Sequence, residues 1–177
     1  ILIQQAVREA KAAVAMDNQN PSYWENLAVI YKQLIGVVDG AADWGIQAYS
    51  QAMTLNPVSP VLRLDFGGLL YAMEKYDEAD RLFEQAVTLK IDFANGWYNW
   101  AHAAKQQKKL TEAVARLSQA LSLVSPESGD YEKASGELAT WKKELEASSP
   151  AATETKPETL KLPEAIPSGV KGKVSVP

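Results

Sequence analysis

The sequence predicts an all-α fold, a solenoid of stacked antiparallel helix pairs, and three observations support this fold class. The chain of 177 residues repeats itself, at a period of about 34 residues. Apolar residues recur at spacings of three and four, which is the period of an α-helix. Small residues return at fixed places in each repeat, where they allow two helix axes to approach closely. One helix pair cannot bury its apolar stripe alone, so we expect the pairs to stack.

The first segment, residues 1–20, is predicted to be the second helix of a truncated repeat. Ala6, Ala10, Ala13 and Met16 match the small and apolar positions of the later second helices. The first helix of this repeat is missing, and the chain begins with Ile1 instead of a start methionine. We therefore expect the chain to be a piece of a longer protein.

Residues 21–59 form the next predicted repeat, and it contains an insertion. Its first helix is expected over residues 21–34, with Trp24, Leu27 and Tyr31 on the apolar stripe. The connection to its second helix is longer than in the other repeats, and the excess, residues 35–44, is apolar and contains glycine. We expect this insertion to fold back onto the helices. The alternative is that it stays exposed and docks a neighbouring domain or a membrane surface.

Two further repeats, residues 60–93 and 94–127, align with each other position by position. The matching pairs are Phe66 with Trp100, Gly67 with Ala101, Ala79 with Ala113, Phe83 with Leu117, Ala86 with Ala120, and Leu89 with Leu123. We expect first helices over residues 60–74 and 95–108 and a second helix over residues 76–90. Pro21 and Pro60 fall where proline fits the first turn of a helix.

The end of the chain is predicted to contain a capping helix and a flexible tail. Residues 128–148 include an amphipathic pattern that would cover the last apolar face, as terminal repeats must. Residues 149–177 are rich in Pro, Ser, Thr, Lys and Glu and contain no aromatic residue. Such a composition cannot offset the entropy cost of ordering, so we expect this tail to be flexible.

Three strings in the chain resemble the tetratricopeptide repeat (TPR) family. They are SYWENLAVIY, YDEADRLFEQAVTLKID and NGWYNWAHAAKQQKKLTEAVARLSQALSL. The family pattern is an aromatic residue, then Leu-Gly or Leu-Ala, then Tyr in the first helix, with spaced alanines in the second. Departures from this pattern occur at Arg63, Gly45, Ile91 and Ser125. The resemblance implies a right-handed superhelix whose first helices line a concave groove.

The resemblance also implies which residues would line the groove. Our candidate partner-binding residues are Glu25, Val29, Lys32, Gln33, Leu64, Tyr71, Asn95, Tyr98, His102, Lys105 and Gln106. Ser22, Val61, Gly68 and Ala72 are expected beside them. Tyr71, Tyr98 and His102 are the expected anchors, because aromatic groups dominate binding energy at such surfaces. This mixture suits an extended peptide or a partner helix. The alternative is that the groove faces solvent or is filled by upstream repeats or by the tail.

One specialised version of this groove is not expected here. Cytoplasmic members of the family grip the terminal carboxylate of a chaperone with paired lysines and asparagines. Asn26 and Asn99 occupy the asparagine sites, but Glu25, Leu64 and Tyr98 stand where a lysine would be required. A carboxylate would be repelled by Glu25 instead of being held.

Composition and motifs argue against several other functions. The net charge of −4 disfavours sequence-independent nucleic-acid binding, which requires a basic surface. No run of about 18 apolar residues is present, so no direct membrane span is expected in this region. His102 is the only histidine and has no recognisable triad, and the sequence suggests no catalytic residue, no metal site and no cofactor.

The sequence therefore favours a non-catalytic scaffold that binds a protein or peptide, the C-terminal part of a larger bacterial protein. A weaker resemblance links the string LIGVVDGAADWGIQAY to the C-terminal repeats of bacterial O-antigen ligase-like membrane proteins. It implies an upstream membrane domain and a place in the cell envelope, outside the cytoplasmic membrane; otherwise the chain would be cytoplasmic. A third hypothesis is an architectural oligomerisation module.

Overall fold

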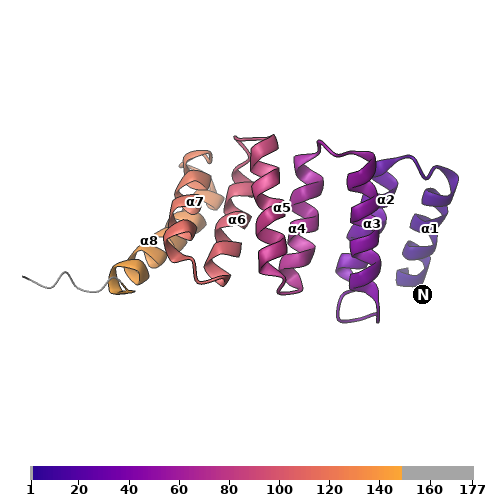
Figure 1. Ribbon diagram of the computed structural model, residues 1–177, viewed down its shortest axis with the longest axis horizontal. Helices are drawn as coiled ribbons and strands as arrows, with labels where there is room; N and C mark the ends of the chain where they lie inside the picture. The colour runs from indigo at the N-terminus through magenta and orange to yellow at the C-terminus, as the bar shows by residue number, and fades with distance from the viewer. Residues whose placement is uncertain (1, 149–177) are drawn as a thin grey trace, which may run out of the picture.

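The computed structural model describes residues 2–148, and these form a row of helices stacked along one axis (Figure 1). The predicted tail, residues 149–177, lies outside the described residues. Within residues 2–148 all regular structure is helical, which confirms the predicted fold class. The helices are α1 (Leu2–Met16), α2 (Pro21–Gln33), α3 (Ala41–Leu55), α4 (Pro60–Ala72), α5 (Tyr76–Leu89), α6 (Ala94–Gln106), α7 (Leu110–Ser122) and α8 (Gly129–Ser148).

The helices pair as α2 with α3, α4 with α5, and α6 with α7, and these pairs have the most extensive contacts. Helix α1 precedes the three pairs and α8 follows them (Figure 1). Pro21 and Pro60 occupy the first turns of α2 and α4, as expected. The residues before them cap these helices: Asn20 accepts a hydrogen bond from the Ser22 N–H and Ser59 accepts one from the Leu62 N–H. These caps satisfy N–H groups that a helix cannot pair internally.

One position of the repeat fixes each first helix to the loop before it. The Trp24 indole donates a hydrogen bond to the Asn18 carbonyl at 2.9 Å, and the Trp97 indole donates one to the Ile91 carbonyl at 2.8 Å. Arg63, which departs from the aromatic pattern, donates to the Ser59 carbonyl at 3.2 Å. The guanidinium therefore makes the same kind of helix-to-loop bond as the indoles that it replaces.

Small residues form the contacts between paired helices. A Cβ atom built at Gly67 would lie 2.6 Å from Cε1 of Phe83, so α4 and α5 approach too closely for a side chain there. Alanines at the other repeat positions are fully buried; they are Ala28, Ala52, Ala79, Ala86, Ala101 and Ala113. Close approach of this kind is why the small residues recur in the sequence.

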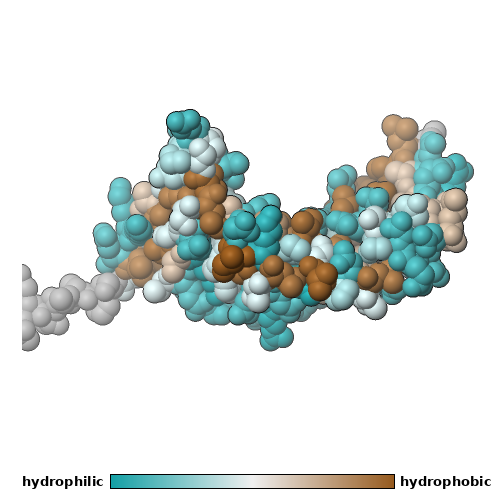
Figure 2. All heavy atoms as spheres, turned by 90° about the horizontal axis from the view of Figure 1, so that it is seen from above, coloured by the Kyte–Doolittle hydropathy of each residue, from teal (hydrophilic) through white to brown (hydrophobic). Residues whose placement is uncertain are grey.

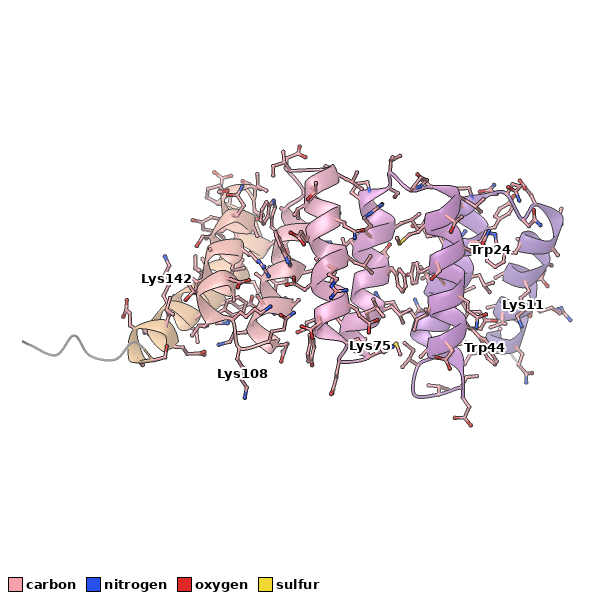
Figure 3. The ribbon with its side chains drawn as sticks, in the orientation of Figure 1. Lys11, Trp24, Trp44, Lys75, Lys108 and Lys142 are labelled. Atoms are coloured by element: carbon pink, nitrogen blue, oxygen red, sulfur yellow. The ribbon has the colours of Figure 1, made fainter. Side chains whose placement is uncertain are left out.

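The insertion between α2 and α3 packs onto the helices in part. Ile35 and Val38 lie against the core, whereas Val37 remains 71% exposed. Trp44, the last residue of the predicted insertion, belongs to α3, where its ring lies 5.4 Å from that of Tyr31. The Lys11 side chain of α1 also lies near Trp44, with its Nζ 5.7 Å from the centre of the Trp44 ring (Figure 3). Trp44, at the start of α3, therefore contacts both α2 and α1.

Candidate partner-binding groove

The described part of the molecule is curved, and one side is hollowed between its two ends (Figure 2). The first helices of the pairs contact one another directly, α2 with α4 and α4 with α6. This is the arrangement expected on the inner side of a curved stack of helix pairs. We call the inner surface of α2, α4 and α6 the groove.

The structure gives the predicted groove residues different degrees of exposure. Gln33, Asn95 and Gln106 are exposed. Half-buried residues are Glu25, Val29, Lys32, Tyr71, Tyr98, His102 and Lys105. Leu64 is only 9% exposed and packs into the core with Phe83, so it offers little surface to a partner.

At the C-terminal end of the groove, Glu137 of α8 joins two of the predicted anchors. The Tyr98 hydroxyl donates a hydrogen bond to Glu137 Oε1 at 3.1 Å, and His102 Nε2 lies 3.1 Å from Glu137 Oε2. The His102 ring also meets Trp141 edge to face, with 5.1 Å between centroids. Tyr98 and His102 are thus already engaged by the chain itself.

Two cations complete this end of the groove. Lys105 forms an ion pair with Glu144 of α8. Lys133 lies 5.3 Å from the centre of the Tyr98 ring. Its interaction with the Tyr98 hydroxyl raises the pKa of the Lys133 amine, while burial raises the pKa of Tyr98. Helix α8 therefore covers much of the groove surface that α6 would present.

In the middle of the groove, a tyrosine bridges two helices. The Tyr71 hydroxyl of α4 accepts a hydrogen bond from Gln106 Nε2 of α6 at 3.2 Å. The Tyr71 ring also meets Tyr76 edge to face, with 5.2 Å between centroids. Tyr71 is half-buried and keeps part of its surface exposed.

At the N-terminal end, two carboxylates influence each other across α2 and α4. Burial raises the pKa of Glu25, and the negative charge of Asp65 raises it further. Burial also raises the pKa of Asp65, and the Lys32 ammonium opposes this rise in part. Among the ion pairs of residues 2–148, none includes Glu25 or Asp65. This end of the groove therefore carries incompletely neutralised negative charge.

Near these carboxylates lies a tyrosine whose hydroxyl has no hydrogen-bond partner among residues 2–148. Tyr49 of α3 is 0% exposed, and its hydroxyl forms no hydrogen bond within the described structure. Its ring stacks on Phe66 with 5.5 Å between centroids. Burial raises the pKa of Tyr49, and the charges of Asp65 and Glu25 raise it further. Buried polar groups are nearly always hydrogen-bonded, so this hydroxyl requires an explanation.

Asp65 and Tyr49 are not among the site residues that the sequence predicted. The repeat register contained a signal for each of them. Asp65 stands at the position of Asn26 and Asn99, and Tyr49 stands at the position of Phe83 and Leu117. The other two repeats have a neutral asparagine at the first position and an apolar residue at the second. The acidic Asp65 and the hydroxyl-bearing Tyr49 therefore distinguish the N-terminal end of the groove.

Residues 2–148 offer neither a metal centre nor a membrane-spanning helix. No three histidine, aspartate or glutamate side chains gather closely enough in this range to hold a metal ion. None of its helices is both long and apolar enough to cross a bilayer.

The fold and the groove define an all-helical repeat solenoid, and similar solved structures show which repeat fold it is. No family model and no curated protein matches the chain. A thermophilic TPR protein of Thermus thermophilus superposes with a TM-score of 0.68 at 21% identity, over 80% of this chain and 74% of that one. The first TPR of Spaghetti (RPAP3), bound to the HSP90 peptide SRMEEVD, gives 0.56 at 23%, over 67% and 93% respectively.

The chain therefore has the tetratricopeptide-repeat fold, as the sequence predicted. A crystal structure of the MamA protein is also similar, with a TM-score of 0.62 at 21% identity over 69% of this chain. This chain spans 64% of the length of that MamA chain. The comparisons do not support the weaker resemblance to O-antigen ligase-like proteins.

Proposed function

We propose that this chain is a non-catalytic interaction scaffold that binds a peptide or a partner helix in the groove. The observation that carries the proposal is the hollowed inner surface (Figure 2), whose α2–α4 part combines polar and apolar side chains beside Gly68. At Gly68 an added Cβ would lie 2.9 Å from the Lys32 amine and would meet no other side chain except the neighbouring Lys32 carbon, so a ligand reaches the α4 backbone once the flexible end of Lys32 moves aside. The similarity to a TPR solved with a peptide supports the same use.

Binding is proposed for the α2–α4 part of the groove in particular. The α6 part is occupied by α8, whose Glu137 and Trp141 contact Tyr98 and His102. The α2–α4 part offers Glu25, Val29 and Lys32 without such a cover. Tyr71 lies between the two parts and is the remaining aromatic anchor.

The test is a selection of peptides followed by a block of the groove. Random dodecapeptides displayed on phage are selected against the full chain, and the best peptide is titrated by calorimetry. Gly68→Arg places a long side chain on the groove floor and should weaken binding at least about tenfold. Ala115→Arg adds the same charge at an exposed position of α7 and should leave affinity unchanged. Equal binding to both variants would remove the groove from the proposal.

We further propose that the chain is the C-terminal part of a larger bacterial protein. In that case the whole protein could include a membrane domain of a glycan ligase or polymerase, for which the repeats would position a partner. The complete reading frame tests this, because many apolar segments of about 20 residues upstream would support the membrane alternative. A complete reading frame without such apolar segments would exclude the membrane alternative and leave the scaffold proposal.

An architectural role is the second alternative, and one observation favours it. Helix α1 exposes Leu2, Ile3 and Met16, which are 82%, 47% and 87% accessible. Two copies could bury these residues against each other. Light scattering that shows a monomer over a wide concentration range would exclude this role.

A further inference from the structure

The N-terminal end of the groove combines three polar side chains that the equivalent positions of the next repeat do not have. Glu25 comes from α2, Tyr49 from α3 and Asp65 from α4. In the same register, the corresponding set one repeat later is Leu64, Phe83 and Asn99. The first set contains two carboxylates and a hydroxyl, whereas the second contains no ionisable group. We call the first set the acidic gap.

The charges in the acidic gap do not balance. Glu25 and Asp65 supply two negative charges when ionised, and Lys32 supplies one positive charge, which leaves a net charge of −1. The Lys32 amine lies over Gly68, where an added Cβ would be 2.9 Å from its Nζ. Lys32 makes no ion pair within 4.0 Å in residues 2–148. One further cation would neutralise the gap.

The Tyr49 hydroxyl indicates where that cation belongs. It is completely buried and lacks a hydrogen-bond partner within the described residues. A hydroxyl can donate one hydrogen bond to a carboxylate, and both carboxylates lie near enough to influence this hydroxyl. An ammonium group has three N–H donors and can bind both carboxylates at once. A guanidinium group offers five donors and fits a carboxylate pair as well.

We propose that the acidic gap receives a lysine or arginine side chain of the peptide bound in the groove, held by the Glu25 and Asp65 carboxylates, with the buried Tyr49 hydroxyl as a positioning group for those carboxylates. This inference rests on the proposed function, because it names the side chain that the peptide carries at one position. The groove of this chain is then selective for basic peptides, in contrast to a groove that grips a carboxylate. A metal ion is a poorer occupant, because no third histidine or acidic side chain lies at the gap within residues 2–148.

The experiment uses the same phage selection against the full chain and compares two double variants. Wild type should enrich lysine or arginine at one peptide position. Glu25→Gln with Asp65→Asn should abolish that enrichment. Glu78→Gln with Glu84→Gln removes the same two charges from exposed positions of α5 and should preserve it. Thermal melts of all variants establish that each one is folded.

Synthetic peptides then measure the contact itself. Replacement of the enriched lysine by norleucine should weaken binding to wild type about tenfold, as expected for loss of one charge-assisted site. The same replacement should have no effect in the Glu25→Gln, Asp65→Asn protein. Tyr49→Phe should weaken the lysine peptide about threefold and leave the norleucine peptide unchanged.

The outcomes separate this inference from the proposed function. If the selected peptides bind in the groove but show no basic position, the inference is wrong and the scaffold stands. If Gly68→Arg weakens the binding of no selected peptide, the proposed function and this inference are both wrong. The chain also has its own lysines at 156, 161, 171 and 173. If changing these four to glutamine increases affinity for the lysine peptide, the chain's own segment holds the gap and the assignment to a separate partner is wrong.

Discussion

The gap between α2 and α4 and the gap between α4 and α6 have the same place in successive repeats but different chemistry. In the first, the buried Tyr49 hydroxyl lies near Glu25 and Asp65 and has no hydrogen-bond partner in the described part of the chain. In the second, Phe83 is fully buried against Gly67, and Leu64 closes the surface above it. The second gap is filled for stability, whereas the first keeps a hydroxyl that residues 2–148 leave without a hydrogen bond. The repeat fixes where side chains lie, and a few departures from it determine where a ligand fits.

The largest expected effect comes from disturbing the filled gap. Gly67→Ala would place a Cβ 2.6 Å from Cε1 of Phe83, inside a packed core that cannot yield easily. We expect the free energy of unfolding to fall by about 2 kcal/mol, as is typical of overpacking. Urea denaturation followed by circular dichroism measures it.

The neighbouring glycine is the control for this prediction. At Gly68 the nearest atom is the mobile end of Lys32, so Gly68→Ala should raise stability by about 0.5–1 kcal/mol through helix propensity. A result in which both substitutions change stability equally would mean that the contact between Gly67 and Phe83 is not limiting.

The next largest effect is expected when the tyrosine of the first gap and the phenylalanine of the second are exchanged. Tyr49→Phe converts the acidic gap toward its filled counterpart by removing an unpaired buried hydroxyl. We expect the free protein to gain about 1 kcal/mol, since an unsatisfied buried group costs on this order. The reciprocal Phe83→Tyr should lose stability, because the second gap offers no charged partner. If Tyr49→Phe is destabilising in thermal melts, the hydroxyl is bonded in solution and the two gaps differ less than proposed.

Local sequence patterns predicted the helices and their close contacts, because both depend on spacing within one repeat. Periods of three and four residues predicted the apolar stripes, and the recurring small residues, Gly67 among them, predicted where paired helices approach closely. The assembly of the groove depends instead on side chains that are distant in the sequence. Tyr98 and His102 meet Glu137 across 39 and 35 residues, respectively. Their pairing with α8 could not be predicted from periodicity, since it depends on how the last helix crosses the groove.

The acidic gap shows the same limit in another form. The register identified Asn26 and Asn99 as equivalent but did not draw attention to Asp65 between them. Its significance depends on burial and on the nearby Glu25 and Tyr49, which come from two other helices. Position in a repeat predicts location, whereas the electrostatic environment requires the tertiary structure.

A third prediction concerns the pH dependence of the acidic gap. The folded state raises the pKa of Glu25 above 4.5 and that of Asp65 above 3.8, mainly by burial. The folded protein therefore binds more protons than the unfolded chain, and this contribution to stability grows as pH falls from neutral toward about 4. Glu25→Gln and Asp65→Asn should each raise the melting temperature at pH 7 by about 1–3 °C, with the gain disappearing near pH 4.

Melting curves across this pH range, with Glu84→Gln as an exposed control, distinguish the gap from general charge effects. A gain that is the same at every pH would show that the two carboxyl groups are not perturbed. Titration of the carboxyl ¹³C signals of both residues provides the direct measurement.

The smallest expected effect concerns the turns, where the repeats differ again. The insertion of the first repeat uses Gly36 and Gly40 at positive φ, whereas the equivalent turns of the next two repeats place Glu74 and Lys108 at φ 60° and 61°. A residue with a Cβ atom is strained in this left-handed conformation, so Lys108→Gly should stabilise the protein by about 0.5 kcal/mol. Lys109→Gly is the matched control, because Lys109 has φ −85° and gains nothing from glycine. Both lysines lie at the α6–α7 turn, where Figure 3 shows Lys108 directed away from the helices. Urea denaturation in which both variants lose stability would show that the positive φ of Lys108 carries no strain.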